Sequence, residues 1–321
     1  MLENNRGRIE SEAILDEGFA LSLGDKAINK NILKGNSFWW NYETRADDIL
    51  ERAQSAGISV LHPYMSAYPK RLLFNKRFPP ILFCRGNIDI LNEEKIVAII
   101  GTREPTEFGC RMGQRLAEIL VNEGYVIVSG LALGCDTIGH EGALTAGGKT
   151  IAVLPTPIDA TVYPEKNQPL SECILKNDGL LISEYPPGVE LRGKQLVNNL
   201  VARDEWQPGL SDGLVVIETS ATGGSNHALR YALSTDTPIA VFDYSHKDNI
   251  DFYRDERFGG NVEYIKNCQS GNITPIFEAS TIEVFKKKME EYRAVIHGSP
   301  WEKPITTKCG GQQMVFFDLL V

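Results

Sequence analysis

Glycine, hydroxyl and arginine side chains follow directly on short apolar runs at several places in this chain. The first group is Gly101-Thr102-Arg103, which comes immediately after the apolar residues 96–100. A glycine lets a ligand approach the backbone, a threonine hydroxyl can donate to an oxyanion, and the arginine fork matches a phosphate. Because such a group is also typical of a simple turn with a surface ion pair, it becomes informative only in combination with others.

The second and most informative group is the sequence SGLALGCDTIGH at residues 129–140. A glycine-spaced turn between a strand and a helix points backbone N–H groups at the helix start, where they favour an anion. We therefore expect Ser129, Gly130 and Gly134 to hold a phosphate. Asp136 lies where a helix N-cap is expected, and His140 follows one turn later. These two residues are predicted either to face the same ligand or to be a plain cap and a packed side chain.

Two further groups also follow apolar runs. Gly223-Gly224-Ser225 combines a diglycine with a hydroxyl at a predicted helix start, which favours a second anion site. Glu218, earlier in the same loop, could hold a ribose or orient a water. Glu184 precedes Pro-Pro-Gly, a rigid turn that could aim this carboxylate into a site or simply hold the loop.

Several common catalytic patterns do not occur in these loops. They contain no Walker A lysine, no GxGxxG follows the first predicted strand, and no GxSxG elbow is found. The six cysteines are scattered without CxxC spacing, which is not typical of a zinc site or a disulfide framework. These absences do not favour a kinase, a P-loop protein, an ordinary dinucleotide-binding enzyme or a serine hydrolase, and we predict a protein without a metal or a cofactor.

The elements that must position these groups alternate regularly along the chain. Short apolar runs rich in β-branched residues predict six strands, at 96–100, 125–128, 150–154, 179–182, 213–217 and 238–242. Stretches with helical spacing lie between them, at 109–122, 136–147, 165–177, 193–206 and 225–234. This alternation predicts a doubly wound, mostly parallel α/β sheet, whose ligands bind at the carboxyl ends of the strands.

The sequence divides into three predicted parts. Residues 1–60 form a small N-terminal helical segment with a helix at 45–56, and residues 61–245 form the α/β domain. Residues 246–321 form a C-terminal extension with a helix at 282–292 and an apolar end at 314–321. We expect that end to pack on the core or to add an edge strand.

Charge and hydropathy restrict the partners. The formal net charge is −9, so nucleic acid could be attracted only by a local cationic patch. No apolar run approaches the roughly 20 residues that span a bilayer, and the first ten residues lack the apolar core of a signal peptide. These features predict a cytoplasmic protein that does not enter a membrane.

With these residues in hand, the chain resembles the DprA/Smf family of DNA-processing proteins. The resemblance rests on ordered motifs between about residues 60 and 245: AYPKRL at 67–72, PPILF at 79–83, RGN at 85–87, GTR at 101–103, SGLALGCD at 129–136, SEYPPG at 183–188 and GLSD at 209–212. It implies a Rossmann-like domain that binds single-stranded DNA and helps to load a RecA-type recombinase, usually as a homodimer and without catalysis. The family's phosphate contacts map onto Arg103, the 129–134 loop and the arginines of an RNR motif.

One departure from the family pattern changes the charge of the predicted DNA groove. Where the family has RNR, this chain reads Arg203-Asp204-Glu205, so one arginine remains and a glutamate replaces the other. A carboxylate that faces a DNA phosphate lowers affinity. The following residue, Trp206, could stack on a base, although burial is the commoner use of a tryptophan.

A second relationship predicts a different function. The loop Thr222-Gly223-Gly224-Ser225 is similar to the PGGxGT loop of the LOG nucleotide phosphoribohydrolases. That resemblance implies a domain that binds or hydrolyses a nucleotide in signalling or phage defence, with Arg203 and either Glu218 or Glu205 as catalytic candidates. The leading prediction remains a non-catalytic, single-stranded DNA-binding protein.

Overall fold

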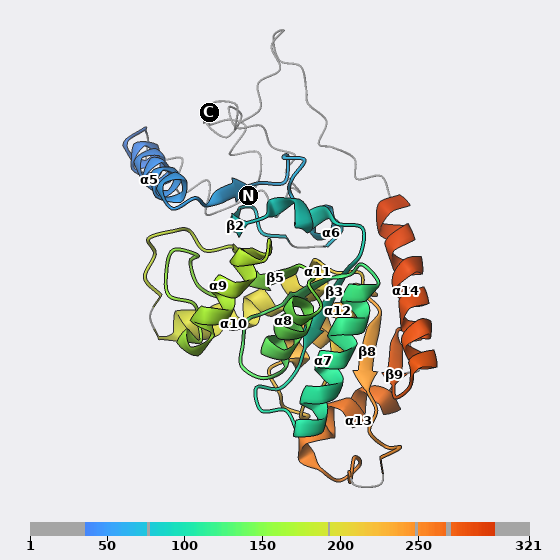
Figure 1. Cartoon of the computed structure of the whole chain (residues 1–321). Helices are drawn as coiled ribbons and strands as arrows, with labels where there is room; N and C mark the ends of the chain where they lie inside the picture. The colour runs from blue at the N-terminus through green and yellow to red at the C-terminus, as the bar shows by residue number, and fades with distance from the viewer. Residues whose placement is uncertain (1–35, 76–77, 192, 248–249, 268–270, 299–321) are drawn as a thin grey trace.

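Nine strands form a single sheet in the computed structural model, which describes residues 36–75, 78–191, 193–247, 250–267 and 271–298 (Figure 1). The strands are β1 Ser59–Leu61, β2 Leu82–Gly86, β3 Ile96–Ile100, β4 Val126–Ser129, β5 Thr150–Val153, β6 Leu180–Ser183, β7 Leu214–Val216, β8 Ile239–Phe242 and β9 Ile273–Ile276. Their order is β1-β2-β6-β5-β4-β3-β7-β8-β9. From β6 to β9 all neighbours are parallel, and β2 pairs antiparallel with both β1 and β6.

The six predicted strands and the mostly parallel doubly wound sheet are confirmed. Each of the six is fully buried, as expected for strands that helices cover on both faces. The sequence analysis did not identify β1, β2 and β9. These three strands lie toward the ends of the sheet, and β9 contains Pro275, which weakens its strand signal.

The helices largely follow the predicted stretches. They are α5 Asn36–Ser55, α6 Lys70–Leu73, α7 Glu107–Asn122, α8 Cys135–Thr145, α9 Gln168–Lys176, α10 Lys194–Asp204, α11 Trp206–Gly209, α12 Asn226–Ser234, α13 Gly259–Lys266 and α14 Ala279–Gly298. Short 3-10 turns add η1 Ile88–Asn92, η2 Glu165–Asn167 and η3 Glu256–Phe258. The sequence analysis did not find α6 and α13, and the expected use of residues 314–321 lies outside the described residues.

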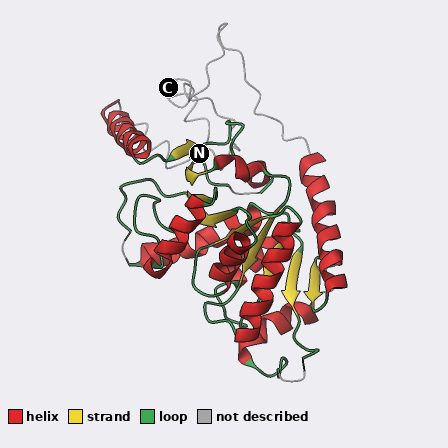
Figure 2. Cartoon of the chain, viewed as in Figure 1, coloured by secondary structure: helices red, strands yellow, loops and turns green. Residues whose placement is uncertain are grey.

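Two helical layers cover the sheet (Figure 2). On one face Trp206 of α11, Leu210 just after it and Leu229 of α12 pack against alternate residues of β3, β7 and β8. On the other face α7 contributes Leu116 and Leu120, which pack on the opposite set of strand residues. The two-residue alternation of strand side chains therefore supplies both cores.

The C-terminal part of the described chain continues the same sheet. β9 pairs with β8, and α14 packs against β9 along that edge (Figure 1). The division of the chain at residue 245 stays a prediction. None of the helices among the described residues is long and apolar enough to cross a membrane.

The connections reverse direction between β3 and β7. The chain leaves β3 through α7 toward β4 on one side, and it leaves β7 through α12 toward β8 on the other. At such a switch point the two outgoing loops separate and leave a crevice at the carboxyl ends of the strands. Two of the predicted site loops, at 101–103 and 219–225, begin there.

Candidate functional site

A crevice of about 420 Å³ lies at this switch point. It combines residues from the loops after β3, β4 and β7 with residues from α8, α10, α11 and α12. The predicted site residues that line it are Gly101, Thr102, Arg103, Asp136, Arg203, Gly223, Gly224 and Ser225. The structure therefore brings together eight residues that the sequence analysis had proposed from four separate segments.

The predicted anion cradle of the β4–α8 loop is occupied by a carboxylate of the chain itself. The N–H groups of Gly130 and Ala132 donate to Asp136 Oδ2 over 3.1 and 3.3 Å. Asp136 is not the N-cap of α8, because that position is Gly134. Ser129 is buried, and its hydroxyl donates to the Ile99 carbonyl. Ser129, Gly130 and Gly134 therefore do not line the crevice.

The glycines of this loop instead make room for the residues that do line it. A Cβ at Gly130 would lie 1.0 Å from Arg203 Nη1, so the missing side chain provides the space for the guanidinium. Gly134 has a φ of 75°, and a Cβ there would approach the Thr102 carbonyl oxygen to 2.4 Å. The next residue, Cys135, donates its N–H to the same carbonyl over 3.0 Å. The glycines of the 129–136 motif thus leave space for the Arg203 side chain and for the backbone of the loop that carries Arg103.

His140 lies in the core and not in the crevice, so of its two predicted roles the structure shows the packed side chain and not the one that faces the ligand. Its side chain is fully buried, and Nδ1 is 2.7 Å from Thr150 Oγ1. The Thr150 hydroxyl donates to the Ile127 carbonyl, so the bond from histidine requires a proton on Nδ1. Burial, with a smaller contribution from Arg203, lowers the pKa of His140 to about 3. The neutral imidazole is a packing group.

Arg203 is buried and is not fully paired. Only 4% of its side chain is exposed, and it lies between two carboxylates, with Nη1 3.6 Å from Asp136 and Nε 3.4 Å from Asp204. Neither Nε nor Nη1 has a hydrogen-bond partner among the described residues. A buried guanidinium without good hydrogen bonds is costly, and Arg203 is also one of the residues that line the crevice.

The remaining walls combine an exposed cation with open backbone. Arg103 is exposed and lines the crevice. Its positive charge lowers the pKa of Asp204, against the larger effect of burial. Gly224 also lines the crevice, and a Cβ there would meet nothing within 4 Å. The nine-residue helix α12 begins two residues later and has no side-chain cap. Its N-terminus adds partial positive charge to the wall.

The three glutamates considered as functional residues do not line the crevice. Glu218 is fully buried and accepts hydrogen bonds from the N–H and hydroxyl of Thr106, the residue that caps α7. Glu205 is the C-cap of α10. Glu184 accepts from the Trp206 indole N–H over 3.3 Å and from the Tyr185 hydroxyl. Glu184 holds its own loop, and Trp206 is buried rather than available for stacking.

Among the lining residues that the predicted site did not include, three come from α10 and α11, namely Leu200, Asp204 and Gln207. Leu200 and Gln207 lie three before and four after Arg203, which is the spacing of one helix face and could have identified them. Gln207 donates from Nε2 to Asp204 Oδ1 over 3.2 Å. Burial raises the pKa of Asp204 to about 6; Arg203 opposes this shift, and Asp136 reinforces it.

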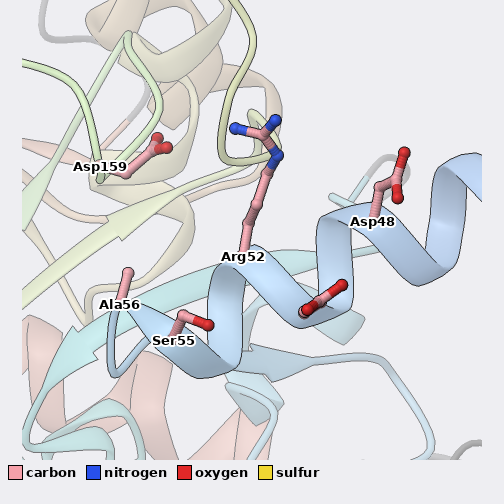
Figure 3. Close-up of a pocket in the computed structure, with 6 residues that line it drawn as sticks. Asp48, Arg52, Ser55, Ala56 and Asp159 are labelled. Carbon is pink, nitrogen blue, oxygen red and sulfur yellow. The ribbon is translucent and has the colours of Figure 1, made fainter.

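A second hollow, of about 490 Å³, lies between α5 and the loop after β5 (Figure 3). Arg52 projects from α5 near Asp159, and Asp48 lies one turn away on the same helix (Figure 3). Asp159 already accepts a hydrogen bond from the Gly188 N–H over 2.8 Å. None of the predicted site residues lines this hollow. The described residues contain no group of three or more His, Cys, Asp or Glu side chains placed to hold a metal.

Comparisons with known proteins agree with this architecture. The model of the family described as DNA recombination-mediator protein A matches residues 59–267. The Smf protein of Synechocystis is 35% identical over 219 residues, which cover 67% of this chain and 51% of that protein. The chain spans about half the length of the curated relatives it matches.

Two solved structures are similar over most of the chain. The DNA processing protein A of Streptococcus pneumoniae has a TM-score of 0.68 and 26% identity, with 88% of each chain covered. The Helicobacter pylori protein, whose structure concerns a single-stranded DNA binding mode, has a TM-score of 0.58 and 28% identity. The match covers 73% of this chain and 97% of the H. pylori chain. The predicted Rossmann-like fold and DprA/Smf resemblance are confirmed, and the chain belongs to the DNA recombination-mediator protein A family.

Proposed function

We propose that this protein binds single-stranded DNA at the switch-point crevice and acts in DNA processing and recombination without catalysing a reaction. One observation carries the proposal. A buried arginine with unbonded guanidinium nitrogens, Arg203, and an exposed arginine, Arg103, converge on one crevice of the fold. A phosphodiester is an anion whose oxygens accept hydrogen bonds from arginine side chains that line a crevice.

The crevice offers a phosphate three kinds of donor. Arg203, Arg103 and the backbone at Gly224, where a Cβ would meet nothing within 4 Å, all line the crevice. A volume of about 420 Å³ accommodates about one nucleotide unit, so neighbouring nucleotides of a strand would extend over the rim. Such a site contacts the phosphate backbone of the DNA and does not distinguish one base sequence from another.

The similarities support the wider role. The H. pylori relative binds single-stranded DNA, and the matching family is named for recombination mediation. We extend both properties to this chain, together with action as a homodimer, loading of a RecA-type recombinase and residence in the cytoplasm, where such a recombinase works. The homodimer, the recombinase and the cytoplasmic location are parts of the proposal, as are the predicted roles of individual site residues.

The nucleotide-hydrolysing alternative is not favoured. It needs a carboxylate beside the bound nucleotide, yet both of its predicted carboxylates, Glu218 and Glu205, lie outside the crevice lining. Glu218 is fully buried and engaged with Thr106. A hydrolase would need a general base within about 3 Å of the proton it takes.

The proposal is tested by binding of a fluorescently labelled oligothymidylate, measured by anisotropy at several salt concentrations. Arg103→Ala should weaken binding at least about tenfold and should reduce the slope of log K against log salt by about 1. The matched control is Arg111→Ala, which removes an arginine that is 61% exposed on α7 and pairs with Glu107. That variant should bind as the wild type does. If the wild-type protein shows no salt-sensitive binding, or if Arg103→Ala binds normally, the proposal is wrong.

A further inference from the structure

Asp204 is placed where a bound phosphate must meet it. It lines the crevice, 18% of its side chain is exposed, and the adjacent Arg203 is the buried cation of the site. The other lining carboxylate, Asp136, is 7% exposed and already accepts two backbone N–H groups. Asp204 is therefore the carboxylate that a ligand beside Arg203 would approach.

The charged groups that face Asp204 come from three elements. Arg203 on α10 lies 3.4 Å away, Asp136 on α8 adds negative charge, and Arg103 in the loop after β3 adds positive charge. From α11, Gln207 donates a hydrogen bond to Oδ1. The loop after β7 lines the crevice with Thr219, Ser220 and residues 223–225, none of which has an acidic or basic side chain.

The formal charges of this group cancel while both aspartates are ionised. Two arginines and two aspartates line the crevice, so an incoming phosphodiester finds no net positive charge there. If one aspartate is neutral, a single positive charge remains, which matches the single negative charge of a phosphodiester. Repulsion between the carboxylate and the phosphate is removed in the same step.

We propose that Asp204 takes up one proton from solvent when a DNA phosphodiester binds beside Arg203, and returns that proton to solvent when the strand leaves. The inference rests on the proposed function and adds a residue that controls it. Protonation turns an acceptor-only carboxylate into a donor whose O–H can reach a phosphate oxygen. Burial already favours the neutral form, since it raises the pKa of the free side chain to about 6. The bound anion raises that pKa further, so uptake occurs at and above pH 6.

The experiment measures the affinity of the full chain for an oligothymidylate without terminal phosphates, from pH 5.5 to 8.5 at constant ionic strength. Wild-type affinity should be highest below pH 6 and should fall by up to about tenfold per pH unit above it. Asp204→Asn keeps the shape and an acceptor for Gln207. Its affinity at pH 8 should match that of the wild type near pH 6 and should not change with pH.

Two controls separate this effect from a general change of charge. Glu205→Gln removes one negative charge at the next residue, which does not line the crevice, and should keep the wild-type pH dependence. Titration calorimetry at pH 7, in buffers of different ionisation enthalpy, measures the number of protons that the protein takes up when the oligonucleotide binds. Wild type should take up most of one proton per site, and Asp204→Asn should take up none. Thermal unfolding confirms that each variant is folded.

The two proposals fail in different ways. If the wild-type protein binds the oligonucleotide with the same affinity across the pH range, or if Asp204→Asn keeps the pH dependence, Asp204 is not the protonated group and DNA binding still stands. If the wild-type protein does not bind at any pH, the proposed function fails, and the proton coupling fails with it.

Discussion

A single missing side chain determines where the buried cation of the crevice lies. Arg203 fits under the β4–α8 loop because Gly130 has no Cβ. The same loop turns its N–H groups onto Asp136, which pairs with Arg203. At the residue scale, then, this glycine-rich motif positions an arginine, and in our proposal that arginine binds the phosphate.

Gly130→Ala should displace Arg203, because the new Cβ would lie 1.0 Å from Nη1. We expect oligonucleotide affinity to fall about tenfold and the free energy of unfolding to fall by about 1–3 kcal/mol. Anisotropy and urea unfolding measure the two effects. Gly298→Ala, at a position with nothing within 4 Å, should change neither. If Gly130→Ala binds DNA with wild-type affinity, Arg203 is not part of the DNA-binding site.

At the scale of elements, one carboxylate joins the end of β7 to the start of α7. Glu218 follows β7 closely and accepts the Thr106 N–H over 2.7 Å. Thr106 in turn caps α7, since its hydroxyl accepts the Gly109 N–H over 3.0 Å. The loop that carries Arg103 runs between β3 and this cap, so Glu218 determines where that loop ends.

Glu218→Ala should lower the free energy of unfolding by about 2–4 kcal/mol, because it leaves a cavity and an unpaired buried N–H. Glu218→Gln keeps one acceptor oxygen and should lose less. Urea denaturation compares the two variants. DNA affinity should fall in Glu218→Ala as the Arg103 loop loosens. Unchanged stability in both variants would show that this contact does not hold the loop.

Across the whole molecule, a buried ion cluster ties three distant segments together at the opposite ends of the strands. Asp212, just before β7, is fully buried between Arg71 of α6 and Arg293 of α14. The Arg71 and Arg293 Nε atoms lie 2.8 and 3.0 Å from its oxygens. The cluster connects the AYPKRL and GLSD motifs with the C-terminal helix.

Asp212→Asn should lower the free energy of unfolding by about 3–5 kcal/mol, because two buried guanidinium groups lose their counter-charge. Thermal and urea unfolding test this. Asp178→Asn removes an aspartate whose exposed side chain pairs with Lys149 over 3.1 Å, and should leave stability nearly unchanged. The folded fraction of Asp212→Asn should still bind DNA normally, since the crevice lies at the other edge. A stable Asp212→Asn variant would refute the role of the cluster.

The sequence by itself determined the family, the six central strands and the loops that meet at the crevice. These are local signals, since β-branched runs predict strands and parallel strands place their carboxyl ends together. The sequence did not predict β1, β2 and β9. Strand pairing at the ends of the sheet depends on partners distant in sequence, and a three-residue strand such as β1 carries little pattern of its own.

Only the tertiary structure decided which groups line the crevice. The N–H groups of the β4–α8 loop point to Asp136, His140 packs in the core, and Asp204 enters the crevice beside Arg203. Spacing along the chain locates a glycine or a carboxylate but does not reveal its hydrogen-bond partner, which comes from another element. Each of these assignments depends on a contact between α8 or α10 and a distant strand or loop.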